Sequence, residues 1–311
     1  GDTSAVAGGR RVDSETYAAG TRTDADRELD TDSGRSSGVH LIARRTQDLG
    51  DGARLVISPF LFARTGELVN ATQKFTYPDP AGLTGLTGDG HARDGNDTQN
   101  LTGRLSFDYK QRRAGQGETS AMLALQGEAS RADRLRREFD AGGVATGVVA
   151  TSDDSREQGL RFRGKRSQAY ADGAHLVTLG LDASYKQTTD TRKETRDGVP
   201  QNLGAQARAE ASDGEFALWV QDEWTFADAH TLTPGLRLAL SSRAVTDGAG
   251  VKIADDSVSW LPSLAWVWRA RAQWNLRAGL AASERLPGVR DLSPVVRTTT
   301  GQNTLSNPVR A

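Results

Sequence analysis

The chain has 311 residues, of which 36% are hydrophobic, and its 39 basic and 40 acidic side chains leave a net charge of -1. Because it contains no cysteine, a disulfide scaffold and a zinc-thiolate site are excluded, and the balanced charge gives no overall signature of nucleic-acid binding. No apolar run approaches the roughly eighteen residues that a membrane-spanning helix needs. Any membrane role must therefore use strands.

Three parts are expected along the chain. We expect residues 1–37 to form an external loop with one poor strand, and residues 286–311 to form a truncated external loop segment. Between them, residues 38–285 are predicted to form five β-hairpins of a barrel wall, because apolar residues recur at every second position in segments of about ten residues. The clearest segment covers 177–185, where Leu179 and Leu181 share one face and Thr178 and Asp182 share the other.

The same alternation predicts about ten strands in all. The remaining nine segments lie at 39–43, 55–61, 105–109, 121–125, 160–162, 216–220, 232–240, 260–268 and 274–280.

The connections between these segments alternate between short and long. Short turns are predicted near 48–52, 114–117, 170–173, 227–230 and 269–271, and long polar links cover 66–100, 130–157, 187–214 and 244–257. This alternation is typical of outer-membrane barrels, which have short periplasmic turns and long external loops. Several structureless links of twenty or so residues disfavour a soluble β-sandwich.

Large aromatic residues fall toward the predicted strand ends, where a ring can lie at the level of the lipid headgroups. Strand propensity also enriches these residue types, so a girdle is one of two interpretations. The residues concerned are Tyr185, Trp224, Trp260, Trp268 and Trp274.

Two stretches resemble the barrel of TonB-dependent receptors. Residues 216–226 read FALWVQDEWTF and are followed at 232–237 by LTPGLR, which is similar to a hairpin common in that family. Residues 260–266 read WLPSLAW, and the strand that begins at 274 returns to a segment in which Arg285 and Pro287 keep the family pattern. Glu284 stands where the family has phenylalanine. The resemblance is strongest over 216–308.

This resemblance implies an all-β antiparallel transmembrane barrel of about twenty-two strands, of which this chain supplies about 10–12. It further implies a bacterial outer-membrane location, a plug domain inside the barrel, and a TonB energy-transducing partner reached through an N-terminal segment. The implied function is uptake of a small-molecule metal chelate, most often an iron-siderophore complex. Cobalamin, haem, other metals and oligosaccharides stay open as cargo. We expect no enzyme activity, cofactor, metal site or nucleic-acid partner.

Four arginines on the polar face are candidate site residues. Arg161, Arg163, Arg237 and Arg277 are expected to face the lumen or the plug, where carboxylates or a chelate can pair with them. The alternative is that they only hydrate the lumen. No ligand contacts are identified, although the links from Gly66 and Ser130 are candidates.

Other motifs carry weaker signals. His40, His91, His175 and His230 are isolated and lack metal-ligand spacing, so we expect surface or interfacial roles. Asp89, Asp94 and Asp97 miss the EF-hand spacing and are expected in a polar loop, as is the basic cluster of Arg134, Arg136 and Arg137. A passive porin-like channel and a secreted adhesin remain alternative functions, although no repeat of fixed length supports an adhesin.

Overall fold

The computed structural model describes residues 2–17, 25–76, 87–113, 117–227, 229–271, 274–284, 297–299 and 302–304, with side chains over 31–73, 88, 90–113, 117–227, 229–270 and 274–284. Within these ranges the chain forms strands and two short 3-10 helices. In order they are β1 (Asp2–Tyr17), β2 (Ala25–Ile42), β3 (Arg45–Gly50), β4 (Ala53–Thr76), β5 (Thr87–Arg113), β6 (Gly117–Phe139), β7 (Ala145–Tyr170), η1 (Ala171–Gly173), β8 (His175–Arg196), β9 (Val199–Pro200), η2 (Gly204–Ala207), β10 (Arg208–Phe226), β11 (His230–Asp247), β12 (Lys252–Arg271), β13 (Trp274–Ala281), β14 (Arg297–Thr299) and β15 (Gln302–Thr304).

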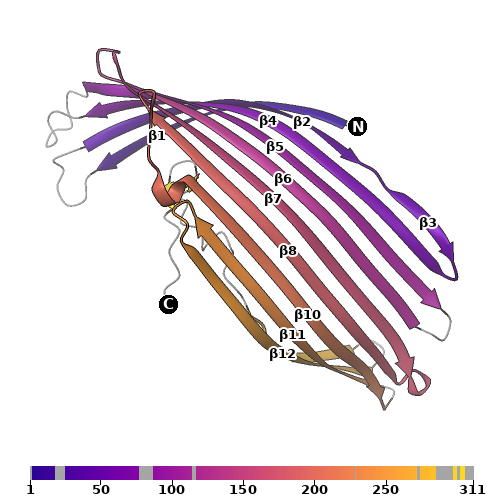
Figure 1. Ribbon diagram of the computed structural model, residues 1–311. Coiled ribbons are helices and arrows are strands. Elements are labelled where there is room, and N and C mark those ends of the chain that lie inside the picture. Colours follow the sequence, from indigo (N-terminus) through magenta and orange to yellow (C-terminus); the bar gives the residue numbers. More distant parts are fainter. Residues whose placement is uncertain are drawn as a thin grey trace.

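The described strands form one large antiparallel sheet in which neighbours in sequence are neighbours in space. The order is β1-β2-β4-β5-β6-β7-β8-β10-β11-β12-β13, with β3 also paired to β4 and β9 to β8, and β14-β15 form a separate pair. Figure 1 shows this sheet as a curved and twisted wall. In the part of the chain that is described, β1 pairs only with β2, and β13 only with β12. The predicted antiparallel barrel wall is confirmed.

The turns between β3 and β4 and between β7 and β8 lie where the sequence predicts them, near 48–52 and 170–173, but the long links are not structureless. The turn predicted at 269–271 falls within β12, which continues to Arg271, and parts of the other two predicted turns lie outside the described residues. β6 continues to Phe139 and β7 begins at Ala145, so most of the link expected at 130–157 is a paired hairpin. Strands β6, β7 and β8 reach 23, 26 and 22 residues. That expectation was wrong because polar residues on both faces leave no apolar alternation to detect. Backbone pairing and ion pairs such as Lys186 to Glu157 (3.2 Å) support the strands there.

The ends of the chain differ in how much is described. Residues 2–17 and 25–42 pair as β1 and β2, where the sequence suggested a loop with one poor strand. Of residues 286–311, only the backbones of β14 and β15 are described. The division of the chain into three parts stays a prediction.

The two faces of the sheet differ as the alternation predicts. Leu179, Leu236 and Leu276 expose 58%, 40% and 45% of their surface on one face, so they do not share a dry interior. The fully buried side chains are small and lie on the opposite, concave face, as with Ala124 and Ala217. A soluble protein has the reverse arrangement, so the exposed leucines form the lipid-facing surface of a barrel.

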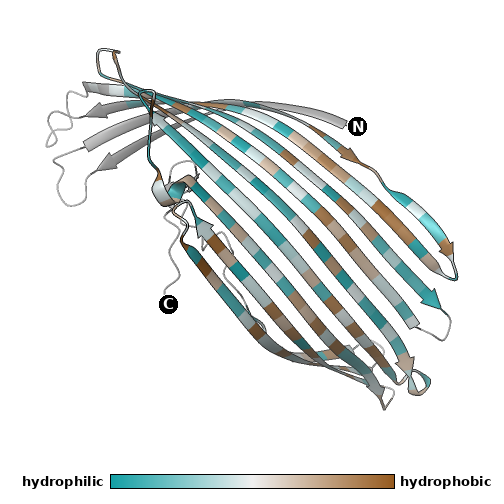
Figure 2. Ribbon diagram, in the orientation of Figure 1, coloured by the Kyte–Doolittle hydropathy of each residue, from teal (hydrophilic) through white to brown (hydrophobic). Residues whose placement is uncertain are grey.

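Apolar residues are concentrated in the half of the coloured strands that lies near the short turns (Figure 2). On β8 the outward positions are apolar from Val177 to Tyr185, and then become polar at Gln187, Thr189 and Thr191. Tyr185 therefore lies in the middle of its strand and not at its end, as does Trp260 in β12. The eleven residues from His175 to Tyr185 span roughly 25 Å along the barrel axis at the usual rise and tilt, which matches the height of an outer-membrane apolar band.

Two prolines interrupt the hydrogen-bond ladder. β2 ends and β3 begins opposite Pro59, whose carbonyl accepts from Ala43 N (3.1 Å) while its ring nitrogen has no hydrogen to donate. Pro234 lies within β11, which begins at His230, and the β10-β11 pairing is interrupted beside it. No helix in the described ranges is long and apolar enough to cross a membrane.

Candidate functional site

The concave face of the sheet holds a hollow of about 1000 Å³ in the half nearest the short turns. Its walls come from strands β4 to β12 and carry the side chains that alternate with the outward leucines. This is the face that would surround the lumen in a closed barrel, so its side chains are the ones available to a plug or to a cargo.

Two of the four candidate arginines meet in this hollow. Arg237 Nη1 lies 2.5 Å from Asp182 Oδ2, and Arg163 Nε lies 3.7 Å from Asp182 Oδ1. Arg237 Nη2 also donates to Glu215 Oε1 at 3.0 Å. The register explains the cluster, because Asp182 is directly opposite Arg163 on β7. The four side chains join β7, β8, β10 and β11 and balance one another in charge.

The other two candidate arginines share the face but not the cluster. Arg161 lies across from Ala124 and Ser184, and Arg277 lies on β13 across from Val267. Both are exposed, and neither forms an ion pair with another residue in the described ranges. Their role toward a plug or cargo stays a prediction.

An aromatic side chain lies beside the ion cluster. Trp219 is paired with Arg237 on one side and Gly180 on the other, and its indole leans over the glycine. A Cβ atom at position 180 would collide with the indole ring. Gly180 therefore provides the space that lets a large flat ring lie against the inner wall, beside Lys165 on β7.

The hollow carries an excess of positive charge. Six of its lining residues are basic and two are acidic. Asp182 is already shared by two arginines, whereas Arg44, Arg54 and Lys165 form no ion pair with any residue whose side chain is described. The hollow is thus suited to negatively charged groups.

The sequence did not single out Asp182, Glu215, Trp219 or Lys165. Because side chains alternate between the two faces of a strand, the sequence does assign these four residues to the same face as the candidate arginines. The strand register, which brings residues from four strands together, has no such signal in the sequence.

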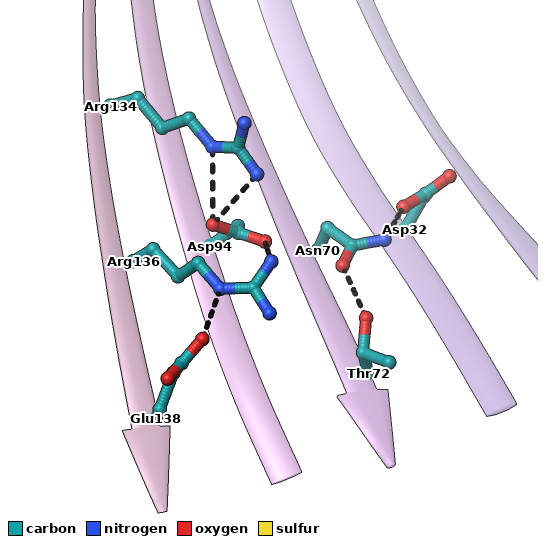
Figure 3. A network of polar contacts seen from close by, with 7 residues as sticks. All are labelled: Asp32, Asn70, Thr72, Asp94, Arg134, Arg136 and Glu138. Atoms are coloured by element: carbon teal, nitrogen blue, oxygen red, sulfur yellow. Dashed lines mark hydrogen bonds and ion pairs between the residues drawn. The ribbon is translucent and has the colours of Figure 1, made fainter. Parts of the chain in front are cut away.

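A second polar cluster lies on the same face in the long hairpins (Figure 3). Asp94 Oδ1 accepts from Arg134 Nη2 (3.1 Å), and its Oδ2 lies 3.5 Å from Arg136 Nη1. Arg136 also donates to Glu138 at 2.8 Å. Asp94 and the two arginines were expected in polar loops, and this is corrected: they belong to paired strands, where Asp94 is buried.

The remaining members of that cluster come from β2 and β4. Asn70 donates to Asp32 at 2.5 Å and accepts from Thr72 at 3.0 Å. Among the side chains described, no group of three or more His, Asp or Glu residues is placed to hold a metal ion. The clusters on this face are networks of ion pairs and hydrogen bonds.

A family model described as "TonB dependent receptor-like, beta-barrel" matches residues 44–310. The chain belongs to this family of TonB-dependent receptor barrels. The expected outer-membrane location is therefore confirmed, and the family is one of receptors and not of enzymes. None of the curated protein sequences matches the chain.

Several solved structures of outer-membrane proteins resemble this TonB-dependent receptor barrel. The copper transporter OprC is 15% identical, with a TM-score of 0.49 and coverage of 95% of this chain and 48% of OprC. The ferric-catecholate import receptor Fiu from Escherichia coli K12 is 11% identical, with a TM-score of 0.43 and coverage of 98% and 53%. The ferric citrate transporter FecA is 11% identical, with a TM-score of 0.40 and coverage of 86% and 43%. The chain thus spans about half the length of these proteins.

Proposed function

We propose that the complete protein is an energised outer-membrane receptor that imports a scarce, negatively charged metal chelate, and that an iron-siderophore complex is this cargo. The observation that carries the proposal is the net-basic hollow on the inner wall, with three cationic side chains left without an ion pair in the described ranges. Carboxylate and catecholate groups that chelate iron leave many such complexes anionic, and guanidinium and ammonium groups attract them.

In this proposal the wall works by binding and guiding, without covalent chemistry. The Asp182 cluster holds Arg163 and Arg237 in place, so the neighbouring Lys165 and Arg54 are the cations that meet an incoming anion or a carboxylate of the plug. A plug domain would close the lumen at rest, and a TonB partner would supply the energy that moves it. Both partners follow from family membership and belong to the proposal.

The test uses the bacterium that carries the gene, grown under iron limitation. Radioactive iron is supplied as an anionic catecholate chelate or as a neutral hydroxamate chelate, with and without a protonophore. We expect deletion of the gene to abolish uptake of the anionic chelate, and the protonophore to do the same in the parent strain. Uptake that continues with the protonophore would identify a passive channel and overturn the proposal.

Charge reversal in the hollow tests the role of the wall. Lys165→Glu combined with Arg54→Glu is expected to weaken uptake of the anionic chelate about tenfold, which corresponds to the loss of one hydrogen bond to a charged group. Lys252→Glu is the matched control, because Lys252 is exposed and lies outside the hollow. Equal losses in both variants would contradict the proposed role.

A further inference from the structure

A second pocket, called here the upper pocket, opens on the concave face beside the hollow, on the side away from the short turns. It has a volume of about 660 Å³, which is within the range of small-molecule sites, and it is lined mainly by β4, β5, β6 and β7. Gln126 and Glu128 of this pocket follow Met122 of the hollow on the same face of β6. Because short turns of such barrels are periplasmic, the upper pocket lies on the external side of the hollow.

Two carboxylates of the upper pocket are directly opposite each other in a strand pair. Glu128 on β6 is in register with Glu157 on β7. Like charges in this position destabilise an antiparallel sheet. The charge of Glu157 is compensated, because its Oε2 lies 3.2 Å from Lys186 Nζ. Glu128 is exposed and forms no ion pair with any side chain that is described, so its charge is available to a cation that enters the pocket.

The upper pocket also holds a guanidinium group without a carboxylate partner. Arg104 on β5 is opposite Gln126 and is therefore the diagonal neighbour of Glu128. Such diagonal neighbours lie about 7–8 Å apart. Within the described ranges, no ion pair joins Arg104 to Glu128 or to another residue. A ligand that carries one positive and one negative group, a few bonds apart, fits between these two side chains.

A buried hydroxyl and an aromatic ring complete the upper pocket. Ser106 lines the pocket and is only 8% exposed, and its hydroxyl forms no hydrogen bond with a described residue. A buried hydroxyl of this kind costs free energy unless a ligand or a water molecule satisfies it. Phe60 on β4, which is opposite Arg104, adds an aromatic face.

The wall compensates its charges elsewhere on the same face. Asp182 is shared by Arg163 and Arg237, and Asp213 lies 3.2 Å from Arg243. The upper pocket differs, because a carboxylate, a guanidinium and a hydroxyl are all left open there. Places where side chains do not compensate one another are expected to be functional sites.

We propose that the upper pocket binds an amino acid group of the cargo, with a free ammonium beside a free carboxylate. Glu128 accepts hydrogen bonds from the ammonium, and Arg104 donates two to the carboxylate. Ser106 and Gln126 supply further hydrogen bonds. The inference rests on the proposed receptor function and gives it a substrate class, namely metal chelates that carry an unblocked amino acid. Because this group has no net charge, it is compatible with an anionic iron centre at the net-basic hollow.

Three gallium(III) hydroxamate chelates that differ in one terminal group test the inference. The first ends in a free amino acid, the second has the amine acetylated, and the third has the carboxylate esterified. Their binding to the full-length receptor, purified in detergent, is measured by isothermal titration calorimetry. We expect the second and third to bind about tenfold more weakly than the first, which corresponds to the loss of one hydrogen bond to a charged group. Equal affinities, or no binding of the first chelate, would overturn the inference.

Variants assign each end of the amino acid group to its partner. Glu128→Gln should weaken binding of the first chelate about tenfold and leave binding of the acetylated chelate unchanged. Arg104→Gln should weaken binding of the first chelate by a similar factor and leave binding of the esterified chelate unchanged. Asp255→Asn is the matched control, because Asp255 is an exposed carboxylate of the same face, opposite Arg243 and outside the upper pocket. A loss as large for Asp255→Asn, or for the acetylated chelate in Glu128→Gln, would refute the assignment.

The two kinds of measurement separate this inference from the proposed function. Discrimination among the three chelates without protonophore-sensitive uptake would support the upper pocket and overturn energised import. Energised uptake without discrimination would do the reverse. If a variant fails to fold, the comparison of the three chelates on the unaltered receptor decides the question.

Discussion

Replacing Leu218 by arginine would place a guanidinium in the middle of the apolar band. Leu218 is 47% exposed and lies between Leu181 and Leu238 on the outward face. Leu181 is six residues above His175, which places this row roughly 15 Å up a band of about 25 Å, near the bilayer midplane. An arginine on the lipid face of a barrel costs about 2–4 kcal/mol there.

Ser259→Arg is the matched control on the inner face at the same height. Ser259 is next to Trp260, which shares the row of Leu218, but its hydroxyl donates to Glu284 on the concave side. An arginine there meets water and a carboxylate. We expect its effect on the free energy of unfolding to stay below about 1 kcal/mol.

The measurement is equilibrium unfolding of the complete barrel from lipid vesicles in guanidinium chloride, followed by tryptophan fluorescence. Retarded migration of unheated protein on a gel reports the fraction folded. A cost for Leu218→Arg no larger than that for Ser259→Arg would refute the assignment of the outward leucines to lipid.

Three further predictions follow from the inner wall and the long hairpins. Gly180→Ala should destabilise the barrel by about 1–3 kcal/mol through its collision with the Trp219 indole, and Trp219→Ala in the same chain should remove most of that cost in a double-mutant cycle. Asp182→Asn leaves two guanidinium groups without their shared carboxylate, and because the cluster is partly exposed we expect a loss of about 1 kcal/mol or less in the same unfolding assay. The pKa of the Asp133 carboxyl is lowered from 3.8, chiefly because Arg131 donates to it, so its stabilising effect is present above pH 3.8 and is lost as the pH falls through the lower folded value. Amide exchange in the β6-β7 hairpin should report this loss, and Arg131→Gln should move it to higher pH.

The sequence predicted well which side chains of the wall face outward and which face inward, because lipid and water select different residue types at alternate positions. Leu179 and Asp182 show this directly: three positions apart, they lie on opposite faces, as the alternation requires. Parity also placed all four candidate arginines on the inner face.

The sequence could not predict strand segments that are polar on both faces, nor contacts that depend on the register of paired strands. Above Tyr185 both faces of β8 are wet, so no apolar period marks the strand, although its ladder continues to Arg196. The meeting of Arg163 and Arg237 at Asp182 depends on the register of three strands. Likewise, His175 and His230 are far apart in the sequence, and only the pairing of β8, β10 and β11 brings them into one row of stacked aromatic rings with Trp224 and Phe226.

The long hairpins also determine how a molecule approaches the barrel. β8 continues for eleven residues beyond Tyr185, a height of roughly 28 Å at the same tilt, and its neighbours rise with it as paired strands. These strands are ordered by folding, so a molecule that binds to them does not add the entropic cost of ordering loose segments.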